Sequence, residues 1–233
     1  MDPIITFHLL AILFLAYFCR LPFLNFPLDD DFAIYTYRAR FMDRGFKWKN
    51  DLQIIGIPMW KMMLFDKVFS SPENGHTRIR NLQTLFHAAA CLSIYWIIFI
   101  VTQNPWAAFT GGILYSFYGT SPDLTAGSFN FEQFYIPFIF SGLAFLLNGS
   151  VFYAGLCFGF AAISKCTMVI YAGAFAPLVW ISNGENPATL FAVTVVSVVI
   201  LSNLAEWKLG FWDGEAIKQI KTRMATTFRI TKT

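Results

Sequence analysis

The stretch "LQTLFHAAACLSIYWIIFIVTQNPWAAFTGGILYSFYGT", residues 82–120, predicts two apolar helices joined by a short turn. It contains no Asp, Glu, Lys or Arg along its whole length. A helix needs about 20 apolar residues to cross the hydrocarbon core of a bilayer, and fewer when neighbouring helices shelter it. The apolar runs 82–102 and 106–120 meet or approach that length, and the "TQNP" that joins them at 102–105 is a turn signal. This part of the chain is therefore predicted to lie in a membrane.

The composition extends this prediction to the whole chain. Of the 233 residues, 56% are hydrophobic and 18% aromatic, and the mean hydropathy is +0.53. Charged residues make up 13%, which is about half their share in soluble domains. The net charge of +3 gives no indication of nucleic-acid binding. The first apolar run ends at Cys19-Arg20 without a small-x-small cleavage site, so it is interpreted as a retained helix.

Seven apolar segments are predicted to form helices, which makes the fold class all-α, a polytopic transmembrane bundle of about seven spans. The separators include "LNGS" at 147–150 and "SNGENP" at 182–187. At "SKCT", 164–167, two short helices could meet at Lys165, or one long helix could kink. The seven segments are 3–19, 82–102, 106–120, 131–147, 150–164, 167–182 and 187–205.

Charged residues are concentrated in two parts of the chain. Residues 20–80 contain 10 of the 17 Lys and Arg, whereas 81–164 contain none and only two acids. We therefore divide the chain into a transmembrane module, 1–205, with a first loop at 20–81, and a basic amphipathic tail, 206–233. Six crossings separate the loop from the tail, so both are predicted to lie on one side of the membrane. Only short, nearly uncharged turns are expected on the other side.

The orientation of this arrangement involves a conflict. The excess of Lys and Arg in the loop and tail would place that side in the cytoplasm by the positive-inside rule. However, the rule is weak for long loops, and many of these cations lie in amphipathic stretches such as "IPMWKMMLFDKVF" at 57–69. Such helices lie in the headgroup layer, where Lys and Arg extend toward water. Their charges therefore need not report which side is cytoplasmic.

Three consecutive acids, Asp29, Asp30 and Asp31, follow the first helix closely. A carboxylate in hydrocarbon is costly, so these side chains should face water or a polar cavity at the membrane surface. Adjacent carboxylates also repel one another, so at least one should have a partner or an altered pKa. The alternative is a solvated turn that caps the next helix, since Asp is a preferred N-cap residue.

Two stretches resemble bacterial GT-C membrane glycosyltransferases. In "DDFAIYTYRARFMDRGFKWKND", residues 30–51, an acidic pair precedes an aromatic helix that ends in Ala-Arg, and a Gly follows. The run 120–170 resembles the third to sixth helices of that family, with Glu132 opening the fourth helix, Gly155 and Gly159 in the fifth, and Lys165 just after it. Nearly the whole chain takes part in the resemblance. The similar families are the dolichyl-phosphate-mannose protein mannosyltransferases and the lipid A aminoarabinose transferases.

The resemblance implies an orientation of the protein in the membrane and a reaction. The N-terminus would be cytoplasmic, and the first loop and tail would lie outside the plasma (inner) membrane of a prokaryote. The implied activity is transfer of a sugar from a polyprenyl-phosphate carrier to an acceptor hydroxyl. A first-loop Asp would act as the base, Asp31 in preference to Asp30. Cations would neutralise the leaving lipid phosphate. The implied substrate-binding residues are Glu132, Lys165, Arg40, Arg78 and Arg80.

Each of these binding roles has a plainer alternative. Lys165 could extend to the interface from a helix end, and Arg78 and Arg80 could anchor the start of the second helix. Glu132 could be a first-turn acid that the helix dipole favours. His8 and His87 lie in apolar helices and are predicted to be packed or hydrogen-bonded inside the bundle.

The length of the chain leaves two functions without catalysis open as alternatives. Relatives usually continue past the seventh helix, so this chain could be completed by a second membrane chain or a larger complex. It could instead be an inactive core that serves as a structural subunit, or a carrier that holds the lipid without chemistry. No cofactor is predicted, and a divalent metal is not indicated. The expected partners are membrane lipids, the polyprenyl-phosphate sugar and another membrane chain, with no nucleic acid.

Overall fold

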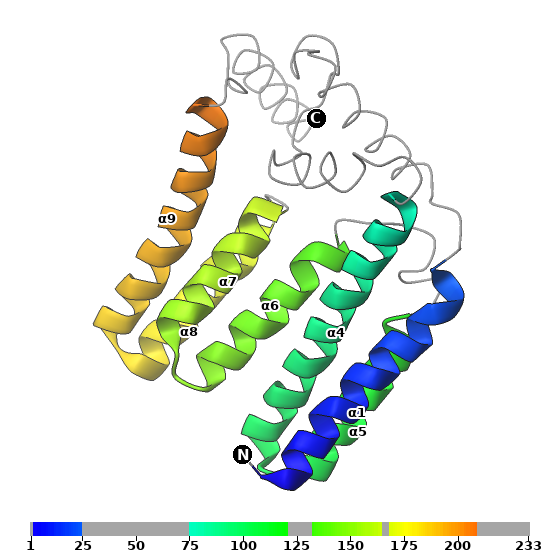
Figure 1. Cartoon of the computed structure of the whole chain (residues 1–233). Coiled ribbons are helices and arrows are strands. Elements are labelled where there is room, and N and C mark those ends of the chain that lie inside the picture. Colours follow the sequence, from blue (N-terminus) through cyan, green and yellow to red (C-terminus); the bar gives the residue numbers. More distant parts are fainter. Residues whose placement is uncertain (1, 25–74, 121–131, 165–167, 209–233) are drawn as a thin grey trace, which may run out of the picture.

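The structure, a computed structural model, describes residues 2–24, 75–120, 132–164 and 168–208. Within these ranges the chain forms seven α-helices and one short 3-10 helix, and no β-strand (Figure 1). The all-α prediction is therefore confirmed for the described residues. The helices are α1 (Pro3–Arg20), η1 (Leu21–Phe23), α4 (Gly75–Thr102), α5 (Pro105–Tyr118), α6 (Glu132–Leu147), α7 (Val151–Ser164), α8 (Val169–Asn183) and α9 (Glu185–Lys208).

Each of the seven predicted segments corresponds to one α-helix, and the clearest difference is the start of α4. This helix begins at Gly75 and not at residue 82, so the predicted loop of 20–81 ends earlier than expected. The reason is that the prediction followed apolar residues only. A helix that leaves the hydrocarbon can continue through the polar sequence "GHTRIRN" of residues 75–81, because nothing in it breaks a helix.

The open question at residues 164–167 is answered by packing. α7 ends at Ser164 and α8 begins at Val169, and the two helices pack against one another. The rings of Phe158 in α7 and Phe175 in α8 have centroids 5.1 Å apart. One long helix could not bring these two side chains together, so this region forms two helices.

Among the described residues, three helices are long and apolar enough to cross a membrane. They are Pro3–Arg20, Arg80–Thr102 and Glu185–Ala205, with mean hydropathies of 1.8, 2.0 and 2.1. The others are apolar but shorter; the 14 residues of α5, for example, extend about 21 Å against a hydrocarbon core of about 30 Å. Seven full spans therefore stay a prediction, while a helical membrane protein agrees with the three long helices.

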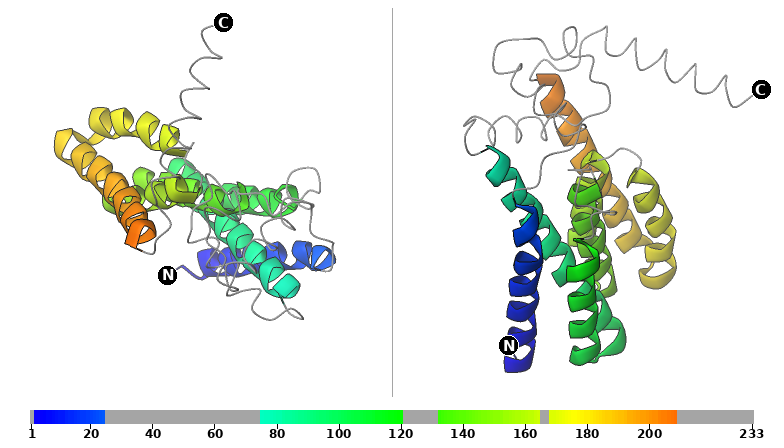
Figure 2. Two further views of the ribbon diagram at one scale, coloured as in Figure 1. Left: turned by 90° about the horizontal axis from the view of Figure 1, so that it is seen from above. Right: turned by 90° about the vertical axis from the view of Figure 1, so that its right-hand side faces the viewer.

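The helices form two clusters that α6 joins. One cluster contains α1, α4 and α5 around buried Ile12, Cys91 and Tyr95, and the other contains α7, α8 and α9 around Phe158 and Phe191. α6 packs against α4 on one side and α7 on the other, as the view from above shows (Figure 2).

The helices run alternately up and down, which gives the bundle two different ends (Figure 1). At the end that we call the turn end, three short turns join α4 to α5, α6 to α7 and α8 to α9. Asn104 caps α5 by accepting hydrogen bonds from two backbone amides, and Gly149 and Gly184 have positive φ angles of 75° and 90°. The helix ends that flank 25–74, 121–131, 165–167 and 209–233 lie at the opposite end, which we call the loop end. This agrees with the prediction that loop and tail share one side.

Exposed aromatic residues lie near both ends of the helices. Many large apolar side chains between them are also exposed, which is the surface expected against lipid. Trp and Tyr are enriched where a membrane protein meets the bilayer surface. Among the described residues, the exposed Trp and Tyr rings are Trp106, Tyr153 and Trp180 toward the turn end, and Tyr17, Tyr118 and Tyr171 toward the loop end.

Candidate functional site

The last residue of α1 points into the bundle. The buried residues of this helix are His8, Ile12, Ala16 and Arg20, each four positions after the one before. Residues four apart lie on one face of an α-helix, so the face that packs on α4 and α5 continues to Arg20. The side chain of Arg20 is only 3% exposed, although it stands at the loop end of the helix.

α4 brings a second group of polar side chains to the same place. Arg80 and Gln83 are 2% and 1% exposed, and Nη1 of Arg80 donates a hydrogen bond of 3.0 Å to Oε1 of Gln83. Thr84 Oγ1 donates to the backbone carbonyl of Arg80 at 2.8 Å. The bond to Gln83 orients the Arg80 guanidinium and leaves the Nε2 group of Gln83 directed elsewhere.

His87, one turn further along α4, is bonded to α5. Its Nε2 lies 3.2 Å from the backbone oxygen of Ser116. A carbonyl oxygen only accepts hydrogen bonds, so Nε2 carries the proton and Nδ1 is the acceptor in the neutral ring. Gly119 makes room for the ring, because a Cβ there would lie 2.6 Å from Cε1 of His87. His87 is thus held in one orientation and one tautomer.

These groups meet around a small cavity between α1, α4, α5 and α6, which we call the arginine cavity. Its polar lining comes from Arg20, Gln83, His87 and Tyr115, and Pro137 of α6 contributes to the apolar side. The cavity volume is about 20 Å³. A site needs about 10–15 Å³ to admit one water-sized atom, so there is room for one oxygen atom and little more.

The electrostatics of the arginine cavity favour a negative ligand. The two guanidinium groups, of Arg20 and Arg80, repel one another. In the part of the chain that the structure describes, Nε of Arg20 and Nε2 of Gln83 have no hydrogen-bond partner. A buried charge is costly unless a partner compensates it. The two carboxylates whose side chains are described, Asp2 and Glu185, lie at the turn end. The cavity can therefore bind an oxyanion, and its lining contains no carboxylate base among the residues that the structure describes.

The residues predicted from the sequence have different outcomes. Asp30, Asp31, Arg40 and Lys165 lie outside the described residues. Glu132 begins α6, as expected. Arg78 and Arg80 lie within α4. The alternative role, as anchors at the start of the second helix, had placed both residues before that helix.

Arg78 and Arg80 differ in their surroundings. Arg78 is exposed and Arg80 is buried. The structure thus buries Arg80 beside Gln83, a residue that lines the arginine cavity, and leaves Arg78 at the surface.

Sequence reasoning missed Arg20 and Gln83. The i, i+4 spacing of His8, Ile12, Ala16 and Arg20 could have shown that Arg20 continues the inward face. However, the spacing alone does not show which face of α1 points inward, because the other faces of this helix are equally apolar.

His8, the other histidine that was predicted to lie inside the bundle, has a packing role. His8 is fully buried, and its ring stacks on Phe109 with centroids 4.3 Å apart and meets Trp106 at 4.7 Å. His87 is hydrogen-bonded inside the bundle, as described above. The prediction that both histidines are packed or hydrogen-bonded is confirmed.

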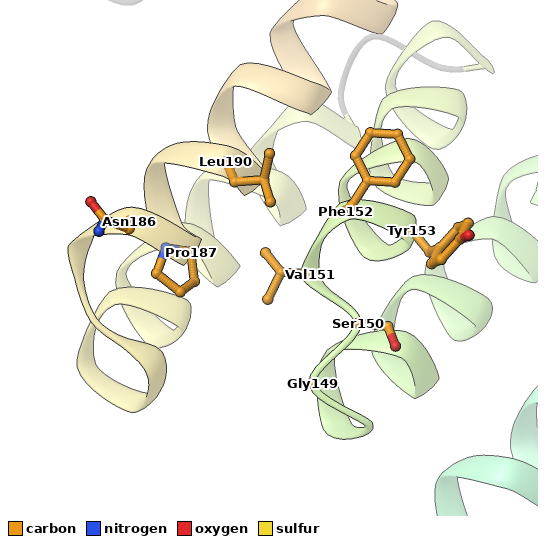
Figure 3. A pocket seen from close by; sticks show the side chains of 8 residues that line it. All are labelled: Gly149, Ser150, Val151, Phe152, Tyr153, Asn186, Pro187 and Leu190. Atoms are coloured by element: carbon orange, nitrogen blue, oxygen red, sulfur yellow. The ribbon is translucent and has the colours of Figure 1, made fainter.

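A larger groove of about 470 Å³ lies at the turn end, between the starts of α7 and α9 (Figure 3). Ser150, Tyr153 and Asn186 supply its polar groups, and the other lining residues are Gly149, Val151, Phe152, Pro187 and Leu190. None of the described residues that line the groove is charged. It lies at the opposite end from the arginine cavity and offers no acid, base or cation for catalysis.

Comparison of the chain with protein-family models, with curated proteins and with solved structures finds no match.

Proposed function

We propose that this protein transfers a sugar from a polyprenyl-phosphate carrier to an acceptor at the external face of the membrane, in the manner of the GT-C glycosyltransferases. The observation that carries the proposal is the arginine cavity at the loop end. Buried cations stand there, at the end where α1 leads into the segment that contains the three consecutive aspartates. Cations for a leaving phosphate and carboxylates for an acceptor proton are the two chemical groups that such a transfer needs.

The proposed reaction assigns a role to each group. The acceptor oxygen attacks the anomeric carbon of the sugar, and its proton passes to the carboxylate of Asp31, with Asp30 as the alternative base. The bond between that carbon and the phosphate oxygen breaks, and the lipid phosphate leaves with the electron pair. Arg80, which is buried beside Gln83 next to the cavity, adds positive charge near that phosphate, and Lys165 and Arg40 are further candidates for the same role.

An amide at the base tests the proposal. Asp31→Asn keeps the size of the side chain and removes its ability to take a proton. A positioned base contributes about 10²–10⁴-fold to rate, so we expect at least a 100-fold loss of transfer from a lipid-linked sugar in membranes. Asp29→Asn removes an equal charge from the same cluster and should keep most of the activity. Full activity of Asp31→Asn would show that the base is another residue.

A structural role in a larger membrane complex is the second candidate. The observation that favours it is the exposure of α9: only 17% of its apolar span is buried by the rest of the chain, against 39% for α4. Native mass spectrometry of the protein extracted gently from its own membrane separates the two candidates. A bound polyprenyl-phosphate sugar supports the transferase and identifies the donor. Stoichiometric membership of a complex without such a lipid supports the structural role.

A further inference from the structure

We propose that the arginine cavity is a binding site for one phosphoryl oxygen, which Arg20 and Gln83 hold through Nε and Nε2. The inference deepens the proposed function. It rests on that function only in taking the lipid carrier as the source of the phosphate. The two atoms named are buried hydrogen-bond donors with no acceptor in the described part of the chain. Both residues line the same cavity.

The geometry selects the kind of ligand. The volume of about 20 Å³ admits one oxygen atom, so the bulk of the ligand must remain at the mouth. A phosphate ester has this shape, because each of its non-bridging oxygens projects from the phosphorus. A planar guanidinium binds such oxygens with strong, charge-assisted hydrogen bonds. Repulsion between Arg20 and Arg80 also falls when an anion lies beside them.

The surrounding groups hold Arg20 and Gln83 ready for this role. Gln83 accepts from Arg80 through Oε1, which turns its amide N–H groups away from Arg80. His87 cannot donate to the cavity from Nδ1, since its proton is on Nε2 and bonded to the carbonyl of Ser116. The buried donors of the lining that lack an acceptor are thus Arg20 Nε and Gln83 Nε2, and these residues come from two different helices.

The experiment measures binding to the full chain in phosphatidylcholine nanodiscs. The probes are polyprenyl monophosphate, the corresponding polyprenyl alcohol and inorganic phosphate. The readouts are lipid occupancy by native mass spectrometry and the apparent Tm. We expect polyprenyl monophosphate to bind and to raise the Tm, and the alcohol to do neither. If inorganic phosphate raises the Tm to the same extent, the cavity binds phosphate but the lipid is not its source, and transferase activity is then judged separately by Asp31→Asn.

Three variants test the residues. Arg20→Gln should weaken binding of polyprenyl monophosphate about 10–100-fold, the effect of one strong charge-assisted hydrogen bond. Arg20→Lys keeps the charge but lacks Nε, and it should fold normally and bind less tightly than the original protein. Arg78→Gln is the matched control, because it removes the same charge from an exposed position on α4, and it should bind normally. Unchanged binding by Arg20→Gln or Arg20→Lys would overturn the proposal.

The sign of the stability change provides an independent test. With no ligand, Arg20→Gln should raise the Tm, because it removes a buried charge that repels Arg80. If a carboxylate of Asp29, Asp30 or Asp31 instead pairs with Arg20, the variant should lower the Tm, since it leaves that carboxylate uncompensated. Substitution of all three aspartates by Asn would then restore part of the loss. That result would assign the cavity to the chain's own carboxylate and overturn the proposal.

Discussion

The packing of α7 on α9 makes the sharpest prediction about stability. Gly155 and Gly159 are one helical turn apart on α7 and face α9. A Cβ added to Gly159 would lie 2.7 Å from Cβ of Val198, and one added to Gly155 would lie 2.8 Å from Cβ of Thr194. Small residues four apart allow membrane helices to approach closely, because their backbones come into direct contact. The two helices are therefore closer than any larger residue on α7 would allow.

The cost of an added methyl group follows from these distances. Carbon atoms in good contact lie about 3.5–4.0 Å apart, so Gly159→Ala would create an overlap of about 1 Å. Cβ of Val198 is attached directly to the backbone of α9, so it cannot move aside without moving the helix. We expect overpacking to cost about 1–3 kcal/mol, against a gain of up to about 1 kcal/mol from the better helix propensity of Ala.

Gly173 provides a matched control for this measurement. It lies in α8, and no atom lies within 4 Å of the position that its Cβ would take. Gly173→Ala thus has the same gain in helix propensity without the overlap. The free energy of unfolding is measured by titration with SDS in mixed micelles and followed by circular dichroism. Gly159→Ala should be about 1–3 kcal/mol less stable than Gly173→Ala. Equal stability of the two variants would refute the close approach of α7 and α9.

Two other contacts can be tested in the same titration. Ser93 Oγ and Ser141 Oγ lie 2.8 Å apart and join α4 to α6, so each Ser→Ala variant should lose about 0.5–1 kcal/mol; a double variant that loses the sum of the two single losses would show that the bond does not form. Gly119→Ala should lose about 1–3 kcal/mol, because its Cβ would displace the ring of His87 from its carbonyl acceptor. In a His87→Ala background only part of this cost should remain, because the added Cβ would still lie 2.9 Å from the backbone oxygen of Tyr115, and an unchanged cost would place all of the strain at that backbone contact.

The positions of the helices could be predicted from the sequence because they depend on local properties. Apolar runs remain in hydrocarbon only as helices, since no other regular structure satisfies every backbone group within one segment. The turns also have local causes: Asn104 before Pro105 is an N-cap signal, and Gly149 and Gly184 tolerate positive φ angles. Polar continuation of a helix, as at the start of α4, leaves no apolar pattern and was missed.

The candidate site could be predicted only in part. The resemblance implied cations that neutralise a leaving phosphate, and Arg80 was named among the candidates. It placed Arg78 in the same group, although only one of the two is buried. It also passed over Arg20 and Gln83, which line the cavity. The identity of the cations was visible in the sequence, but their exposure was not.

For the part of the chain that the structure describes, the sequence alone thus determined that it is helical, where its helices begin and end within a few residues except at the start of α4, and which helix ends share a side. Only the tertiary structure decided which face of each helix is buried, that α6 joins two clusters, and that Gly155 and Gly159 contact α9. The physical reason lies in the membrane-like composition. A helix in water shows its buried face through an amphipathic pattern, whereas a helix that is apolar all round presents the same chemistry to lipid and to its neighbours. Which face is inside is then decided by the shapes of the neighbouring helices.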